Sequence, residues 1–116
     1  MPGGYVDRGE SPASACRREL REEIGLDRAP GRLLVLDWAP NENEGDKVLS
    51  VFDGGDLGDD ETRIKLDGTE LDHWQWVPVA NLGDYVIPRL VRRLTRAYEA
   101  RQQGATLYLE HGEPTG

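Results

Sequence analysis

The clearest periodic pattern of hydrophobic and polar positions lies in residues 12–24. Apolar side chains recur there at helical spacing, at Ala13, Cys16, Leu20 and Ile24. Ser11 followed by Pro12 is a favourable helix start, because serine can cap the helix and proline needs no N–H at the first position. Gly25 provides a stop, since glycine accepts the left-handed conformation that ends many helices. The pattern predicts a helix over residues 12–24 whose apolar stripe faces a core.

The rest of the chain reads mainly as short strands and one further helix. Strands are expected at residues 32–38 (RLLVLDW), 47–52 (KVLSVF), 62–66 (TRIKL), 71–77 (LDHWQWV) and 106–109 (TLYL). The first two would form a hairpin across Pro40 and a polar turn. Trp74 and Trp76 share one face of the fourth strand, where core packing is favoured over stacking on a nucleobase. Residues 53–61 are predicted to be a solvated loop, residues 79–84 a turn, and residues 112–116 a tail.

A second helix is predicted from Pro88 to about Gln103, with Gly104 as its stop. Its apolar stripe consists of Leu90, Val91, Leu94, Ala97 and Tyr98. Arginines occupy the other side, at Arg89, Arg92, Arg93, Arg96 and Arg101. Cations that lie along the surface of an acidic protein explain this side better than an RNA-binding face does.

Three carboxylates of the first helix are unfavourably placed. Glu19, Glu22 and Glu23 lie at i, i+3 and i+4, where like charges cost roughly 0.2–0.5 kcal/mol per pair. The last two also occupy the final turn, where the helix dipole favours cations. Local rules broken repeatedly at one place indicate a functional site, and converging carboxylates suit a hard divalent cation such as Mg²⁺. A solvated acidic helix face is the alternative.

The segment from Gly4 to Leu26 resembles the Nudix box of the Nudix hydrolases, G-x5-E-x7-R-E-U-x-E-E-x-G-U, where U is a bulky aliphatic residue. Every fixed position is matched, from Gly4 and Glu10 through RELREEIGL, and the Pro-Gly-Gly at its start (residues 2–4) is typical of the family. The resemblance implies a mixed α/β (α+β) fold, an α/β/α sandwich around a mixed sheet. It also implies an enzyme that hydrolyses the diphosphate linkage of a nucleoside diphosphate joined to another group.

The resemblance further implies a divalent-metal site. In the family the helix glutamates, here Glu19, Glu22 and Glu23, bind Mg²⁺ or Mn²⁺, and the carbonyl of the preceding glycine, here Gly3, commonly joins them. Glu70 matches loosely a further metal-binding or water-orienting glutamate, with Asp72 as a weaker candidate. Glu19 matches the general base of some members, while others use a carboxylate outside the box. The resemblance also assigns Arg18 to the catalytic site. In the family, the arginine at this position usually forms an ion pair with the glutamate that corresponds to Glu10.

Composition and charge limit the number of domains, the binding partners and the cellular compartment that we expect. The chain has 116 residues and a formal net charge of −8, so we expect one domain, residues 1–116, that repels an unaided phosphate substrate. The charge argues against nonspecific binding to nucleic acid or to an anionic membrane. No apolar run approaches the ~20 residues of a membrane span, and a single cysteine, Cys16, forms no internal disulfide. These features fit a cytoplasmic enzyme with a small-molecule nucleotide substrate.

The beginning of the chain departs from the family pattern. Members normally carry further strands of the central sheet before the Pro-Gly-Gly, whereas this chain starts at Met1. The fold is therefore expected to be N-terminally truncated. Three alternatives follow: an upstream segment absent from the sequence, a homodimer whose partners cover each other's sheet edges, or a marginal fold.

The sequence is compatible with three functional hypotheses. The leading one is a metal-dependent Nudix-type pyrophosphohydrolase. The second is a nucleotide-binding module with weak or no turnover, and the third is an inactive truncated fragment. No substrate-binding residues are identified, and the substrates considered are oxidised nucleoside triphosphates, nucleotide sugars, dinucleoside polyphosphates and capped ends.

Overall fold

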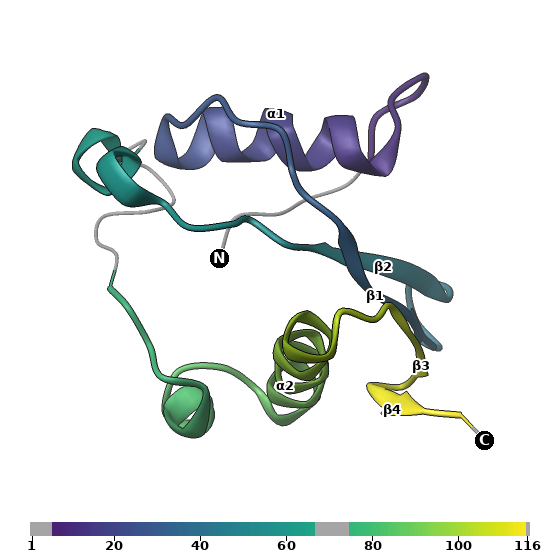
Figure 1. Ribbon diagram of the computed structural model, residues 1–116. Helices are drawn as coiled ribbons and strands as arrows, with labels where there is room; N and C mark the ends of the chain where they lie inside the picture. The colour runs from purple at the N-terminus through teal and green to yellow at the C-terminus, as the bar shows by residue number, and fades with distance from the viewer. Residues whose placement is uncertain (1–5, 67–74, 116) are drawn as a thin grey trace. The chain divides into compact units, whose positions relative to one another are not determined.

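The computed structural model describes residues 6–66 and 75–115. The chain forms two compact units, one of Met1–Gly31 with Gly54–Gln75 and the other of Arg32–Asp53 with Trp76–Gly116. The described elements, in chain order, are α1 (Pro12–Ile24), β1 (Leu33–Ala39), β2 (Lys47–Phe52), the 3₁₀ helix η1 (Gly58–Arg63), the 3₁₀ helix η2 (Val79–Asp84), α2 (Pro88–Gln103), β3 (Leu107–Glu110) and β4 (Glu113–Pro114) (Figure 1). The mixed α/β class predicted from the sequence is confirmed.

Helix α1 has the boundaries predicted from its capping residues. The Ser11 hydroxyl accepts a hydrogen bond from the Ser14 N–H at 3.1 Å, and Gly25 ends the helix with a φ of 71°. The predicted apolar stripe is only half-buried, and the buried helix positions are instead Ala15 and Glu23. The side of α1 that is withdrawn from water therefore includes one of the three box carboxylates.

The predicted strand at residues 62–66 is wrong. Residues 58–63 form η1, and residues 64–66 have no regular secondary structure. Asp and Thr side chains compete for nearby backbone groups, and the Thr62 hydroxyl donates to the Asp59 carbonyl at 2.8 Å. The Lys65 N–H donates to the Ile24 carbonyl at 2.8 Å, which joins this segment to the end of α1. The loop predicted at residues 53–61 thus includes the start of a 3₁₀ helix.

The second unit is built on a four-stranded mixed sheet of order β2-β1-β3-β4. The predicted hairpin is confirmed, since β1 and β2 pair antiparallel with Ala39 opposite Lys47. Strand β3 pairs parallel with β1, and β4 pairs antiparallel with β3. The last strand lies in the segment predicted to be a tail, where a two-residue turn at His111 and Gly112 reverses the chain with φ values of 56° and 79°.

Helix α2 packs against this sheet and supplies part of its core (Figure 1). The helix ends at Gly104 with a φ of 68°, as predicted. The buried cluster consists of Leu34, Val35, Ala97, Ala100 and Leu109. Tyr98 was placed on the apolar stripe by the sequence pattern, but its side chain is exposed. Ala100 takes the buried position, because a small side chain allows the helix to approach the sheet closely.

A buried ion pair fixes α2 to β1. Asp37 is fully buried, and its Oδ2 accepts from Arg93 Nε at 2.7 Å. Its Oδ1 accepts from the Gly112 N–H at 2.9 Å. Arg93 was predicted to be a surface cation, and this expectation is wrong, because the buried carboxylate needs a charged partner.

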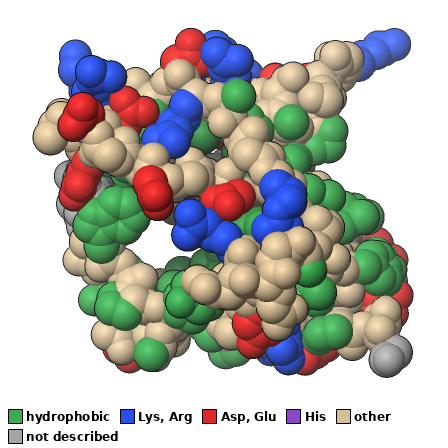
Figure 2. All heavy atoms as spheres, in the orientation of Figure 1, with side chains coloured by type: hydrophobic (Ala, Val, Ile, Leu, Met, Phe, Trp, Pro, Cys, Tyr) green, Lys and Arg blue, Asp and Glu red, His purple; other side chains and the backbone are tan. Residues whose placement is uncertain are grey.

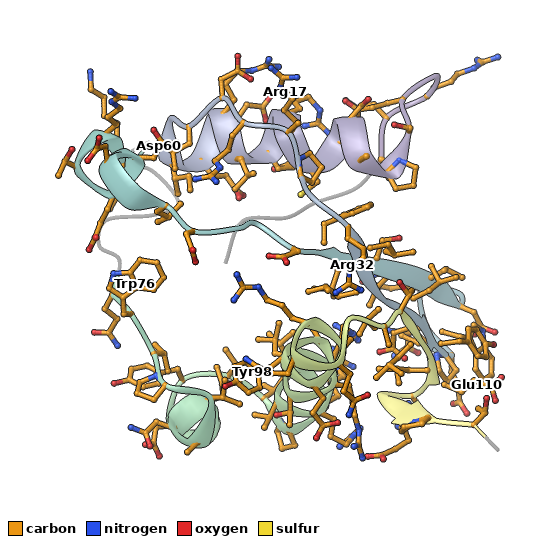
Figure 3. All side chains as sticks on the ribbon, in the orientation of Figure 1. Arg17, Arg32, Asp60, Trp76, Tyr98 and Glu110 are labelled. Carbon is orange, nitrogen blue, oxygen red and sulfur yellow. The ribbon has the colours of Figure 1, made fainter. Side chains whose placement is uncertain are left out.

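Part of the predicted strand at residues 71–77 lies outside the described residues, including Trp74. Residues 75–77 are not in a strand, and the Trp76 side chain is exposed (Figure 3), so the core position predicted for Trp76 is wrong. The turn predicted at residues 79–84 is the 3₁₀ helix η2.

Candidate active site

Arg18, near the middle of α1, is surrounded by carboxylates. Its guanidinium lies within ion-pair distance of Asp7, Glu10, Glu19 and Glu22. The Nε and Nη2 atoms donate to the two oxygens of Glu10, at 2.9 and 3.1 Å, which is a bidentate pair. The Nη1 atom donates to Glu19 Oε1 at 2.7 Å and to Glu22 Oε2 at 3.3 Å. One cation therefore links the loop before α1 to two glutamates of the helix, and the Arg18–Glu10 pair expected from the resemblance is present.

The loop before α1 is itself held by Glu10. The Glu10 N–H donates to the Asp7 carbonyl at 3.0 Å, and Glu10 Oε1 accepts from the Asp7 N–H at 3.0 Å. Gly9 adopts a φ of 80°, which the turn requires and which glycine accepts without strain. The sequence did not indicate the ion pair between Asp7 and Arg18.

The hydrogen bonds that Arg18 donates shift the pKa values of Glu10 and of Arg18 itself. The Arg18 side chain lowers the pKa of Glu10, and the Asp7 N–H lowers it further. In turn the hydrogen bonds from Arg18 to Glu10 and to Glu19 raise the pKa of the guanidinium. Both shifts favour the charged forms of Glu10 and Arg18. Across the face in Figure 2, basic and acidic side chains are interspersed over α1 and η1.

The three box glutamates differ in their exposure. The Glu19 side chain is 14% exposed and the Glu22 side chain 57% exposed, whereas Glu23 as a residue is 9% exposed. Glu19 and Glu22 share the Nη1 atom of Arg18, so these two carboxylates are brought to one point. Glu22 has the greatest access to solvent and to a ligand.

Several predicted site residues lie outside the described residues, namely Gly3, Gly4, Glu70 and Asp72. Within residues 6–66 and 75–115, no three His, Cys, Asp or Glu side chains converge closely enough to hold a metal ion. Because carboxylates repel one another, three of them converge only where a cation compensates their charge. The donor set nevertheless fits Mg²⁺ or Mn²⁺, since carboxylate oxygens on successive turns of one helix are hard ligands.

Two polar arrangements were not found from the sequence. One is the Asp7 carboxylate beside Arg18, at 3.5 Å from its Nε. The other is the ion pair of Arg17 with Asp27, at 2.7 Å, whose two side chains are about half exposed; Arg17 is labelled in Figure 3. The spacing of Arg17 and Asp27 spans the end of the helix, and a helical pattern gives no signal for such a contact.

Mg²⁺ is usually bound by one or two carboxylates together with substrate phosphates, and the carboxylates of α1 near Arg18 are oxygen ligands of this kind. Comparison with known proteins makes this assignment specific. The model of the NUDIX domain matches residues 1–100, and the chain belongs to the Nudix hydrolase family. Members of this family are typically pyrophosphohydrolases and commonly depend on divalent metal ions.

Similar proteins include RNA pyrophosphohydrolases from three bacteria. The protein from Roseobacter denitrificans is 29% identical, with 76% of this chain and 64% of the relative covered. Those from Mesorhizobium japonicum and Brucella ovis are 30% identical, with 76% of this chain and 61% and 59% of the relatives covered. The chain thus spans about three fifths of the length of these relatives. No solved structure matches. No helix among the described residues has the length and apolar character that a membrane crossing requires.

Proposed function

We propose that this protein is a metal-dependent pyrophosphohydrolase that cleaves the diphosphate linkage of a nucleotide substrate by attack of water on phosphorus. The observation that carries the proposal is the complete Nudix box from Gly4 to Leu26, in which Arg18 of α1 joins Glu10 to Glu19 and Glu22. The second hypothesis, a binding module without turnover, shares these contacts and differs only in the measured product.

Each box residue has a proposed role. Glu19, Glu22 and Glu23 would hold Mg²⁺ or Mn²⁺, together with the Gly3 carbonyl and Glu70. When bound, the metal ion would supply charge neutralisation and lower the pKa of the attacking water. Glu19 would accept the proton of that water, and Arg18, whose Nη1 donates to Glu19 at 2.7 Å, would position this carboxylate before the metal ion binds.

A 5′-polyphosphorylated RNA end is the substrate that we favour, because the similar proteins are RNA pyrophosphohydrolases. The internal phosphodiesters of RNA contain no diphosphate, so such an enzyme acts on the terminus alone. Recognition of one terminus does not need the basic surface that binding along an RNA strand requires, and the net charge of −8 is compatible with it. A small-molecule nucleotide is the alternative substrate.

The test is a substrate panel measured with and without Mg²⁺ or Mn²⁺. The panel contains 5′-triphosphorylated RNA, a dinucleoside polyphosphate, a nucleotide sugar and a nucleoside triphosphate. We expect metal-dependent release of pyrophosphate or phosphate, fastest from the RNA. Faster hydrolysis of a small nucleotide would overturn the RNA assignment alone. Binding of these compounds without any metal-dependent product would favour the module without turnover.

A further inference from the structure

The two edges of the Arg18 guanidinium contact different carboxylates. The Nε and Nη2 edge bonds Glu10, which lies before α1, at 2.9 and 3.1 Å. The Nη1 atom bonds Glu19 and Glu22, which lie on α1, at 2.7 and 3.3 Å. The arginine side chain is 19% exposed, so water screens these contacts only partly. Arg18 is thus shared between a loop carboxylate and two of the proposed metal ligands.

We propose that Arg18 competes with the divalent cation for Glu19 and Glu22, and that Glu10 sets the metal affinity by holding the opposite edge of the guanidinium. This inference rests on the proposed function. In it Glu10 is a positioning residue, which never touches the metal or the substrate and acts through Arg18.

Electrostatics gives the reason for competition. A guanidinium and a divalent cation that share one carboxylate lie within a few ångströms of each other and repel. The cation therefore binds most favourably when Nη1 releases Glu19 and Glu22. Glu10 makes that release inexpensive, because its bidentate hydrogen bonds keep the guanidinium neutralised. Asp7, at 3.5 Å from Nε, adds to the negative charge on the same edge.

Loss of the Glu10 charge should therefore weaken metal binding, although Glu10 is not itself a metal ligand. In the Glu10→Gln protein, Arg18 still has Asp7 and the two helix glutamates as charged partners. The guanidinium binds Glu19 and Glu22 more strongly, and the divalent cation binds more weakly. Asp27→Asn removes the same charge from the same unit, beside Arg17, and is the matched control.

The experiment measures the dissociation constant of Mn²⁺ by isothermal titration calorimetry. The proteins compared are wild type and the single variants Glu10→Gln, Asp27→Asn and Arg18→Gln. Two double variants combine Arg18→Gln with Glu10→Gln or with Asp27→Asn. We expect Glu10→Gln to weaken Mn²⁺ binding about five- to tenfold, within the range of couplings between contacting residues. Asp27→Asn should change it less than about twofold, because the Asp27 side chain is 54% exposed and water and salt screen its charge. Arg18→Gln alone should tighten binding. In the Arg18→Gln background, Glu10→Gln should have no larger effect than Asp27→Asn.

Two results would overturn the inference: equal effects of Glu10→Gln and Asp27→Asn in the wild-type background, or an undiminished Glu10→Gln effect when Arg18 is absent. The second would mean that Glu10 acts through the loop instead. If Arg18→Gln fails to fold, Mg²⁺ titration of the ¹⁵N-arginine-labelled wild type decides the question. The Nη hydrogens of Arg18 should then exchange faster with water while the Nε–H stays protected, and unchanged Nη exchange would contradict competition. A wild-type protein that binds no Mn²⁺ overturns the proposed function itself, so the two failures are distinguishable.

Discussion

The ionised Glu10 carboxylate stabilises the loop before α1 through its hydrogen bonds with Asp7 and Arg18. Hydrogen bonds from Arg18 and from the Asp7 N–H lower its pKa below the ordinary value of 4.5. A depressed pKa in the folded protein means that the ionised carboxylate stabilises the fold at pH values above 4.5, and that this contribution disappears as the pH falls through the folded value.

We therefore expect Glu10→Gln to lower the midpoint of thermal unfolding at pH 7, and the difference from wild type to shrink as the pH falls from about 5 towards 3. Scanning calorimetry across this range measures it. Glu42→Gln, at an exposed position of the β1–β2 turn, is the control. A difference that stays constant with pH would show that the ionised carboxylate is not what stabilises the loop.

Contacts between individual side chains were predictable only where both residues belong to a known motif. The Arg18–Glu10 pair follows from the resemblance, since both residues occupy fixed positions of the box. Asp37 lies in an apolar run, LLVLDW, and nothing in that run indicates a partner. Its partner Arg93 is 56 residues away, in a row of arginines that a helical pattern assigns to solvent. Such a pair is a product of tertiary packing.

At the scale of the elements, the glycines that end the two helices provide a matched comparison. Gly25 and Gly104 both have left-handed φ values, 71° and 68°, which cost an alanine about 1–2 kcal/mol. They differ in their surroundings. A Cβ at Gly25 would lie 3.2 Å from Lys65 Cβ, whereas a Cβ at Gly104 would meet nothing within 4 Å.

Gly25→Ala should therefore destabilise the protein more than Gly104→Ala. The first substitution combines backbone strain with a close contact against Lys65, and the second has the strain alone. Urea unfolding of the two variants measures the difference in the free energy of unfolding. Equal losses would mean that the segment around Lys65 moves away without cost.

The elements with two defined ends were the predictable ones. Helices α1 and α2 have a proline at the start and a glycine at the end, and their observed bounds agree with the sequence pattern. The strand expected at residues 62–66 failed because five alternating residues are weak evidence, and local hydrogen bonds such as that of Thr62 with Asp59 favoured η1. Strand β4 was missed because the two residues beyond the His111–Gly112 turn are too few for any periodicity.

At the scale of the whole molecule, the buried Asp37–Arg93 pair joins several elements of its unit. It connects β1 to α2, and through Gly112 it reaches the turn between β3 and β4. We expect Asp37→Ala to lower the free energy of unfolding by about 3–5 kcal/mol, because it leaves Arg93 without its buried partner.

Urea unfolding measures this loss, with Asp53→Ala as the control. Asp53 pairs with Arg101 at 3.1 Å across a more exposed part of the same unit, so its removal should change stability little. A small effect of Asp37→Ala would show that Arg93 finds another partner or reaches water.

The proposed hydrolysis requires the box glutamates to bind the metal ion. The most direct measurement is the rate of metal-dependent hydrolysis of 5′-triphosphorylated RNA and of small nucleotides by Glu22→Gln and Glu23→Gln, beside wild type and Glu42→Gln. Loss of one ligand should reduce the rate about a hundredfold or more, since metal ions supply several kcal/mol of charge stabilisation in such reactions. Glu42→Gln should keep the wild-type rate. Full activity of Glu22→Gln or Glu23→Gln would contradict the proposed active site.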